Sequence, residues 1–295
     1  PTADTVGAAA PLNHGRFGHQ ATLGPDNKVV VTGGFLARDT ETSVAAFAEV
    51  YDVESNTWTV ATDPLHTGGV FHAQTRLSAT GVLTCGGLNA AFLPSAECQI
   101  VRPDGSIIAA PDLDQPLLHA QLTDLGDERV LLTGGLVTPE ASEALPFHSD
   151  LSATSSAWVL EETTWRPVGS MSIARAMHST TRTSDGRVVI AGGVSRIAAA
   201  SDRNGQSYGG LLYDAADALP CVEVYDPETR SFTALSACNA GSTSGALPSP
   251  VALPTIAHDP VFGTLITGGL AADPRQSSVQ RTLLYPRFSD RNQVE

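Results

Sequence analysis

The sequence predicts an all-β protein built from stacked four-stranded units, and two observations support this prediction. First, a short apolar, β-branched run followed by two glycines occurs five times in the 295 residues. These diglycines are Gly33–Gly34, Gly86–Gly87, Gly134–Gly135, Gly192–Gly193 and Gly268–Gly269. Second, no long amphipathic helical pattern appears anywhere in the chain. A repeat of about 50 residues with variable insertions is typical of the blades of a β-propeller.

Each repeat contains four strand-like pieces joined by turns rich in Gly, Pro, Asp and Asn. In the first repeat these pieces are residues 18–23, 28–34, 48–53 and 57–60. The fourth repeat shows the same order. We therefore expect residues 1–295 to form a single β-propeller domain. Its blades are expected at approximately 16–60, 70–110, 117–168, 175–236 and 254–286 plus 2–12.

The pattern resembles the kelch repeat over nearly the whole chain. Arg16 and His19, like Arg175 and His178, match the Arg-x-x-His start of that repeat, and the diglycines match its double glycine. The aromatic positions of strands three and four are matched by Tyr51, Tyr225, Tyr285, Trp58 and Trp165, with Phe232 substituting and Trp158 expected at the tyrosine position of blade three. The resemblance implies a propeller of the galactose-oxidase-like kelch superfamily.

The ends of the chain suggest how the ring closes. The last repeat supplies only three clear strands, and residues 2–12 precede Arg16 as residues 164–174 precede Arg175. We therefore expect five four-stranded blades, the last closed by the N-terminal strand, which would leave few open sheet edges. Kelch-like propellers usually have six or seven blades, so a ring with more blades, or a larger protein, remains an alternative.

The four cysteines fit the same strand map. Cys85 and Cys98 flank one hairpin connection, and Cys221 and Cys238 flank another. Opposed residues of antiparallel strands lie within disulfide range. We predict the disulfides Cys85–Cys98 and Cys221–Cys238, and hence an extracytoplasmic location (periplasmic, cell-surface or secreted). The alternative is four buried free thiols in a cytosolic protein.

The net charge of the chain limits the classes of partner that we expect. The net charge is −14, which disfavours nucleic acid and anionic lipid surfaces. No apolar run reaches the roughly 20 residues that span a bilayer, so no membrane span is expected.

Five histidines, His19, His72, His119, His178 and His258, are expected at the same place in each blade. A ring of imidazoles could bind a metal. We favour a structural role between neighbouring blades.

The long connections all fall on one predicted face, where the strand 2–3 loops and the links between blades emerge. They span residues 35–47, 136–156, 194–220 and 236–253. Long loops on a rigid scaffold concentrate binding residues. We expect this face to bind a protein or a glycan. The candidate ligand-binding residues are Glu140, His148, Asp150, Arg196, Asp202, Arg203, Tyr208, Tyr213 and Asp214.

These residues form no recognisable catalytic constellation. The sequence thus predicts a non-catalytic extracytoplasmic binding module without a cofactor, with a calcium site left open on the loop from Asp202 to Asp217. One alternative is a carbohydrate-active enzyme of the oxidase or epimerase kind. Copper-radical chemistry is disfavoured because the cysteines are expected to pair and three of the five tyrosines belong to the strand-three pattern. A second alternative is a structural domain of a larger surface protein.

Overall fold

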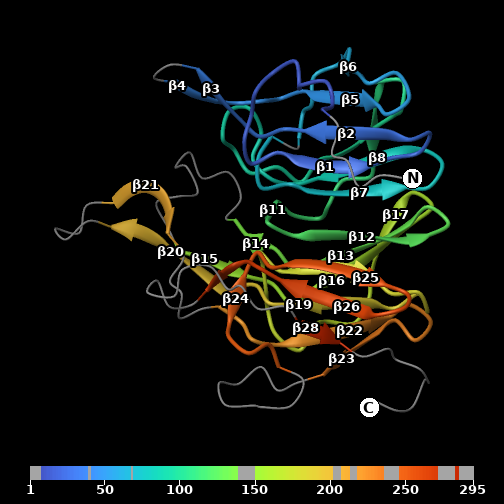
Figure 1. The fold of residues 1–295 in the computed structure, drawn as a ribbon. Coiled ribbons are helices and arrows are strands. Elements are labelled where there is room, and N and C mark those ends of the chain that lie inside the picture. Colours follow the sequence, from blue (N-terminus) through green and yellow to red (C-terminus); the bar gives the residue numbers. More distant parts are fainter. Residues whose placement is uncertain are drawn as a thin grey trace.

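The computed structural model describes residues 8–38, 41–67, 69–138, 150–201, 207–212, 218–235, 246–271 and 283–285. Every regular element in these ranges is a β-strand. Four four-stranded antiparallel sheets and one three-stranded sheet follow one another along the chain, and we call them blades one to five (Figure 1). The all-β prediction is therefore confirmed. Within the described ranges there is no helix long and apolar enough to cross a membrane.

The blade strands have the following bounds. Blade one contains β1 (Gln20–Leu23), β2 (Lys28–Thr32), β5 (Ala48–Asp52) and β6 (Thr57–Val60). Blade two contains β7 (Ala73–Leu77), β8 (Gly81–Cys85), β9 (Cys98–Val101) and β10 (Ile107–Ala110). Blade three contains β12 (Gln121–Gly126), β13 (Arg129–Thr133), β16 (Ala157–Glu161) and β17 (Thr164–Pro167). Blade four contains β18 (Ser179–Arg182), β19 (Val188–Ala191), β22 (Val222–Asp226) and β23 (Ser231–Ala234). Blade five contains β25 (Thr255–Asp259), β26 (Gly263–Thr267) and β28 (Leu283–Tyr285).

The diglycines join each blade to the next. The Gly135 N–H donates to the carbonyl of Arg175, 2.9 Å away, and the Gly193 N–H donates to the carbonyl of Val251, 2.8 Å away. A Cβ atom added at Gly134, where φ is +58°, would clash with the carbonyl oxygen of Arg175. Glycine is therefore required both for its backbone conformation and for the close approach of the next blade.

Apolar side chains fill the spaces between consecutive blades. Val30 and Val50 of blade one pack with Val82 and Val101 of blade two. The same arrangement recurs between blades two and three, three and four, and four and five. Valine and leucine dominate because the central strands of each blade are covered on both faces.

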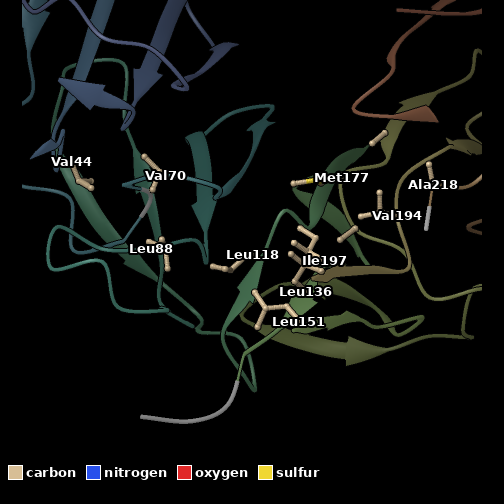
Figure 2. Packing of buried hydrophobic residues seen from close by; sticks show 12 residues of the cluster. Val44, Val70, Leu88, Leu118, Leu136, Leu151, Met177, Val194, Ile197 and Ala218 are labelled. Carbon is tan, nitrogen blue, oxygen red and sulfur yellow. The ribbon is translucent and has the colours of Figure 1, made fainter. Parts of the chain in front are cut away.

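A further apolar cluster lies among the long connections. Figure 2 shows part of it, with Leu118, Leu136, Leu151 and Ile197 drawn close together. These leucines and isoleucine lie on a separate sheet, whose strands belong to the connections between and within the blades. Its strands, in order, are β11 (Leu117–Leu118), β14 (Leu136–Val137), β15 (Leu151–Ala153), β20 (Arg196–Ser201) and β21 (Ser207–Leu212). We call this the loop sheet.

Two smaller strand pairs complete the described elements. β3 (Phe35–Arg38) and β4 (Glu41–Val44) form a hairpin in the connection between β2 and β5. β24 (Val251–Ala252) pairs with β27 (Leu270–Ala271) beside blade five. Long connections that the sequence suggested as loops are thus partly ordered as strands.

The N-terminal segment contacts blade one at an informative place. The Trp58 indole N–H donates to the carbonyl of Ala10, 2.8 Å away, and the Trp165 indole N–H donates to the carbonyl of Pro111, also 2.8 Å away. Pro111 follows the last strand of blade two, so Ala10 holds the corresponding place beside blade one. Residues 8–12 do not themselves form a strand. Closure of a five-bladed ring by residues 2–12 remains a prediction.

The first predicted disulfide is present. Cys85 and Cys98 face each other on β8 and β9, with their Cα atoms 4.2 Å apart, and are bonded. Cys221 is also disulfide-bonded. Its predicted partner, Cys238, lies outside the described residues.

The expected position of Trp158 is wrong. Trp158 faces Leu132, which is the register position that Glu49 occupies in blade one and Glu223 occupies in blade four. The tyrosine position of blade three holds Leu160. Trp158 packs against the apolar cluster between blades two and three, whereas blades one and four have a buried carboxylate at this position.

Candidate functional site: the long-loop face

The ordered connections gather on the predicted face. The β3–β4 and β20–β21 hairpins both project to the left in Figure 1, beyond the ends of the blade strands. β20 is tied to β15 through the pairing of Ser152 with Arg196, and β15 is tied to β14 through the pairing of Leu136 with Ala153. The long connections of blades three and four therefore share one sheet. The loop sheet therefore gives this face a surface with a defined backbone.

Two of the predicted site residues, Asp150 and Arg196, meet beside strands β15 and β20 of the loop sheet. Arg196 Nη1 lies 3.4 Å from Asp150 Oδ2, and the two side chains are 48% and 56% exposed. An ion pair this exposed contributes little to stability because water and salt screen it. Both groups remain accessible to a ligand from solvent.

The other predicted ligand-binding residues lie in β21 or outside the described residues. Tyr208 lies in β21, where only the backbone is described. Glu140, His148, Asp202, Arg203, Tyr213 and Asp214 lie outside the described residues, as does most of the candidate calcium loop. Their roles stay predictions.

A belt of residues with positive φ surrounds the start of the innermost strands. The five blades place Gly18, Phe71, His119, Met177 and Leu253 at the same position, with φ of 68°, 59°, 54°, 53° and 50°. The His119 N–H donates to the Phe71 carbonyl, the Met177 N–H to the His119 carbonyl and the Leu253 N–H to the Met177 carbonyl. This chain of hydrogen bonds passes from blade to blade. Only Gly18 signals the conformation in sequence, so sequence reasoning missed the belt.

The predicted ring of five equivalent histidines is wrong in register. Only His19, His72 and His178 precede the innermost strand at the same position. His119 lies one position earlier, in the belt, and His258 lies within β25, with its imidazole near the hydroxyls of Thr264 and Ser184. A shift of one residue reverses the direction of the His119 side chain, and His258 lies four residues beyond the shared position, near the far end of β25. These imidazoles therefore do not converge.

Two of the histidines in register contact the preceding blade. His72 Nε2 lies 2.7 Å from the Thr32 hydroxyl of the preceding blade, and His178 Nε2 lies 2.9 Å from the Thr133 hydroxyl. Burial lowers the pKa of His72 to about 3. Burial, with the positive charge of Arg175 nearby, lowers the pKa of His178 well below its usual value. The imidazoles of His72 and His178 are therefore neutral and link neighbouring blades.

An aromatic surface lies beside the belt on the same face. Phe35 is central: its ring centroid lies 5.3 Å from that of Phe17, 6.1 Å from that of Phe71 and 6.4 Å from that of Phe92. Phe17 is 56% exposed. Phe35, Phe71 and Phe92 are partly buried against the central apolar cluster. We call these four residues the aromatic platform, which sequence reasoning did not identify.

The described residues contain no group of three or more His, Cys, Asp or Glu side chains that could hold a metal ion. On the opposite face, a polar cleft is lined by Gly24, Asp26, Lys28, Glu54 and Arg76, among others. Its lining carries charges of both signs, so it favours no single class of ligand.

No protein-family model matches the sequence, and comparison with curated proteins gives no match. Among solved structures, the chain is similar to YjhT, with a TM-score of 0.69 and 16% sequence identity over 98% of this chain and 87% of that chain. It is also similar to a fungal alcohol oxidase of the AA5 family in complex with copper, with a TM-score of 0.57 and 16% identity over 90% of this chain. The match spans 50% of the oxidase. These likenesses show that the chain shares its fold with both proteins. At such identities they show the fold alone.

Proposed function

We propose that this protein is a non-catalytic, extracytoplasmic binding module that holds a protein or glycan ligand on its long-loop face. The observation that carries the proposal is the loop sheet. Connections from blades three and four, which could have been separate loops, are joined into one sheet on the side of the molecule where the connections are longest.

The loop sheet is anchored from beneath. Leu136, Leu151 and Ile197 are at most 1% exposed and belong to the central apolar cluster. A surface whose backbone is already held in place loses little conformational entropy when a ligand binds. This favours recognition by a preformed surface.

The proposed location rests on the cysteines. Cys85 and Cys98 form a disulfide, and Cys221 is disulfide-bonded as well. Stable structural disulfides are characteristic of oxidising compartments. A net charge of −14 also favours neutral or cationic ligands over phosphate-rich ones.

The test is a binding screen of the whole chain against arrays of glycans and extracellular proteins. Arg196→Ala should lower the affinity for the captured ligand, since Arg196 lies in β20 of the loop sheet. Arg187→Ala is the matched control, because Arg187 pairs with Asp185 in a short turn on the opposite face. Equal loss in both variants, or no loss in either, would contradict a site on the long-loop face.

The non-catalytic role is tested on the same ligands. The captured ligand should be recovered unchanged after prolonged incubation, as judged by mass spectrometry. Turnover that depends on the protein would replace the binding module with an enzyme.

A further inference from the structure

We propose that blade five of this protein docks on blade one of a second copy of the same chain. The inference concerns the surfaces between blades and does not depend on the proposed function of the long-loop face. It is carried by groups of blades one and five that repeat the contacts of the internal junctions but have no partner among the described residues.

Four internal junctions join blades one to five, and all use the same backbone contact. The N–H of the second glycine of each diglycine donates to a carbonyl two residues before the belt position of the next blade. The pairs are Gly34 with Gly69 at 2.6 Å, Gly87 with Leu117 at 2.9 Å, Gly135 with Arg175 at 2.9 Å and Gly193 with Val251 at 2.8 Å. A Cβ atom added at the first glycine, Gly86, Gly134 or Gly192, would clash with the same carbonyl.

Blade five has the same diglycine without a following blade. Gly268 and Gly269 have φ of 68° and 92°, close to the values at the internal junctions. A Cβ atom added at Gly268 would meet no described atom within 4 Å, and the Gly269 N–H donates to no carbonyl of the described residues. On blade one the equivalent carbonyl is that of Arg16, two residues before Gly18, and no described N–H donates to it. Blade five therefore ends in a donor, and blade one begins with an acceptor.

A side-chain contact is divided between the two blades in the same way. Thr267 ends the second strand of blade five, and His19 precedes the innermost strand of blade one. Among the described residues, neither side chain has a hydrogen-bond partner. At two internal junctions the corresponding residues are in contact, with the Thr32 hydroxyl 2.7 Å from His72 Nε2 and the Thr133 hydroxyl 2.9 Å from His178 Nε2.

Apolar side chains on these two faces also remain partly exposed. Leu265 of blade five is partly exposed, whereas the residues at its position in the other blades, Val30, Leu83, Leu131 and Val189, are at most 1% exposed. Val29 of blade one is partly exposed, whereas Val82, Val130 and Val188 at its position are fully buried. Contact between the two faces would remove this apolar surface from water.

The two faces complement each other rather than themselves. Blade five offers a backbone donor and a threonine, and blade one offers a backbone acceptor and a histidine. The innermost strands pack in the order β1, β7, β12, β18 and β25, and β25 does not pack on β1 in this way. The complement of each face is therefore found on a second copy. Because different faces meet, the contact is head-to-tail, and each assembly keeps one face of each kind until it closes.

The test is sedimentation of the whole chain over a range of concentrations, and we expect the average mass to rise with concentration. Gly268→Ala should abolish this rise, because its methyl group would meet the incoming carbonyl. Gly186→Ala is the matched control: Gly186 also has a positive φ, and a Cβ there would meet only the end of the Arg182 side chain at 3.8 Å. Thr267→Val, which removes one hydroxyl, should weaken association about fivefold.

A mixing experiment tests the direction of the contact. Gly268→Ala leaves the blade-one face intact, so adding this variant to the unchanged chain should lower the average mass by capping each assembly at one end. Association that Gly268→Ala does not affect, or that Gly186→Ala removes equally, would overturn the inference.

A single copy at every concentration would also overturn it, and hydrogen exchange would then say what covers the two faces. A Gly269 amide protected from exchange would mean that blade five closes on blade one of the same molecule. A Gly269 amide that exchanges freely would leave both faces to a different polypeptide. None of these outcomes bears on ligand binding at Arg196, so the proposed function is tested separately.

Discussion

At the scale of single residues, two buried ion pairs hold the starts of blades one and four. Arg175 pairs with Glu223, and Arg16 pairs with Glu49, with all four side chains fully buried. Each arginine also donates to a carbonyl of the adjacent diglycine, Gly192 or Gly33. The arginine of the Arg-x-x-His start therefore holds the segment that enters the blade against the end of the second strand and against the third strand. In blade two, Gln99 substitutes for the carboxylate and accepts from the backbone at His66 and Thr67.

Removing one partner of such a pair leaves an uncompensated buried charge. We expect Glu223→Ala to lower the free energy of unfolding by about 3–5 kcal/mol in chemical denaturation. Glu161→Ala, which removes the exposed contacts to Arg166 and Arg230, should cost at most about 1 kcal/mol. Similar losses in the two variants would show that the buried pair is not the anchor of blade four.

The buried imidazoles make stability depend on pH. Burial lowers the pKa of His72 to about 3 and that of His119 to about 4 in the folded protein. In the unfolded chain both titrate near pH 6.5, so the unfolded state binds more protons below that pH. Their contribution is fully present above about pH 6.5 and is lost as the pH falls toward 4.

Unfolding measured at pH 7.5 and at pH 5 should differ by about 2 kcal/mol for each such histidine. His72→Asn should reduce this difference. His66→Asn, a substitution of a solvent-exposed histidine, should leave it as it is. A pH dependence that His72→Asn leaves unchanged would contradict the assignment.

At the scale of elements, the diglycine is the unit that fixes one blade against the next. The Gly134 position receives the carbonyl of Arg175 so closely that a methyl group has no room. Gly186 also has a positive φ of 87°, but a Cβ there would meet only the end of the flexible Arg182 side chain, 3.8 Å away. The two glycines therefore separate the cost of conformation from the cost of close approach.

Gly134→Ala should lower the free energy of unfolding by at least about 2 kcal/mol more than Gly186→Ala. Both variants place a side chain at a positive φ, but only Gly134→Ala also introduces a clash with a backbone carbonyl. Chemical denaturation of the two variants measures the difference. Equal costs would mean that blades three and four are not packed at this carbonyl.

The same elements show what the sequence could predict. The blade strands and the Cys85–Cys98 disulfide followed from alternation, turn residues and the diglycine. The misplaced Trp158, His119 and His258 did not, because a shift of one to four residues changes the side-chain environment without changing the composition. The loop sheet was also missed: its strands are short and pair with segments distant in sequence, so no local pattern marks them. Phe71 and Phe92 carry no sequence signal of positive φ.

At the scale of the whole molecule, each blade packs chiefly on its neighbours in sequence, and the belt of hydrogen bonds from Phe71 to Leu253 runs across blades two to five. The described parts of the long connections lie on one face and the short turns on the other (Figure 1). Binding residues can therefore be altered on the long-loop face without changing the packing between blades. The N-terminal segment joins this arrangement at the Trp58 indole of blade one.

Deletion of residues 1–12 should destabilise the protein by about 2 kcal/mol, because Ala10 accepts from the Trp58 indole and donates to the Asn56 side chain. It should also shift tryptophan emission to the red as Trp58 becomes exposed. Trp58→Phe in the shortened chain should remove that shift, whereas the other two tryptophans stay in place. An unchanged spectrum and melting temperature would argue that the segment does not complete a neighbouring blade.

The disulfide between Cys85 and Cys98 has a consequence for chemical access. Both residues are 2% exposed and lie in the apolar cluster that blade three covers. A small thiol reductant can reach the sulfurs only when blades two and three separate. The rate of disulfide cleavage in dilute dithiothreitol would then report how often blades two and three separate. This rate can be measured without any label or substitution.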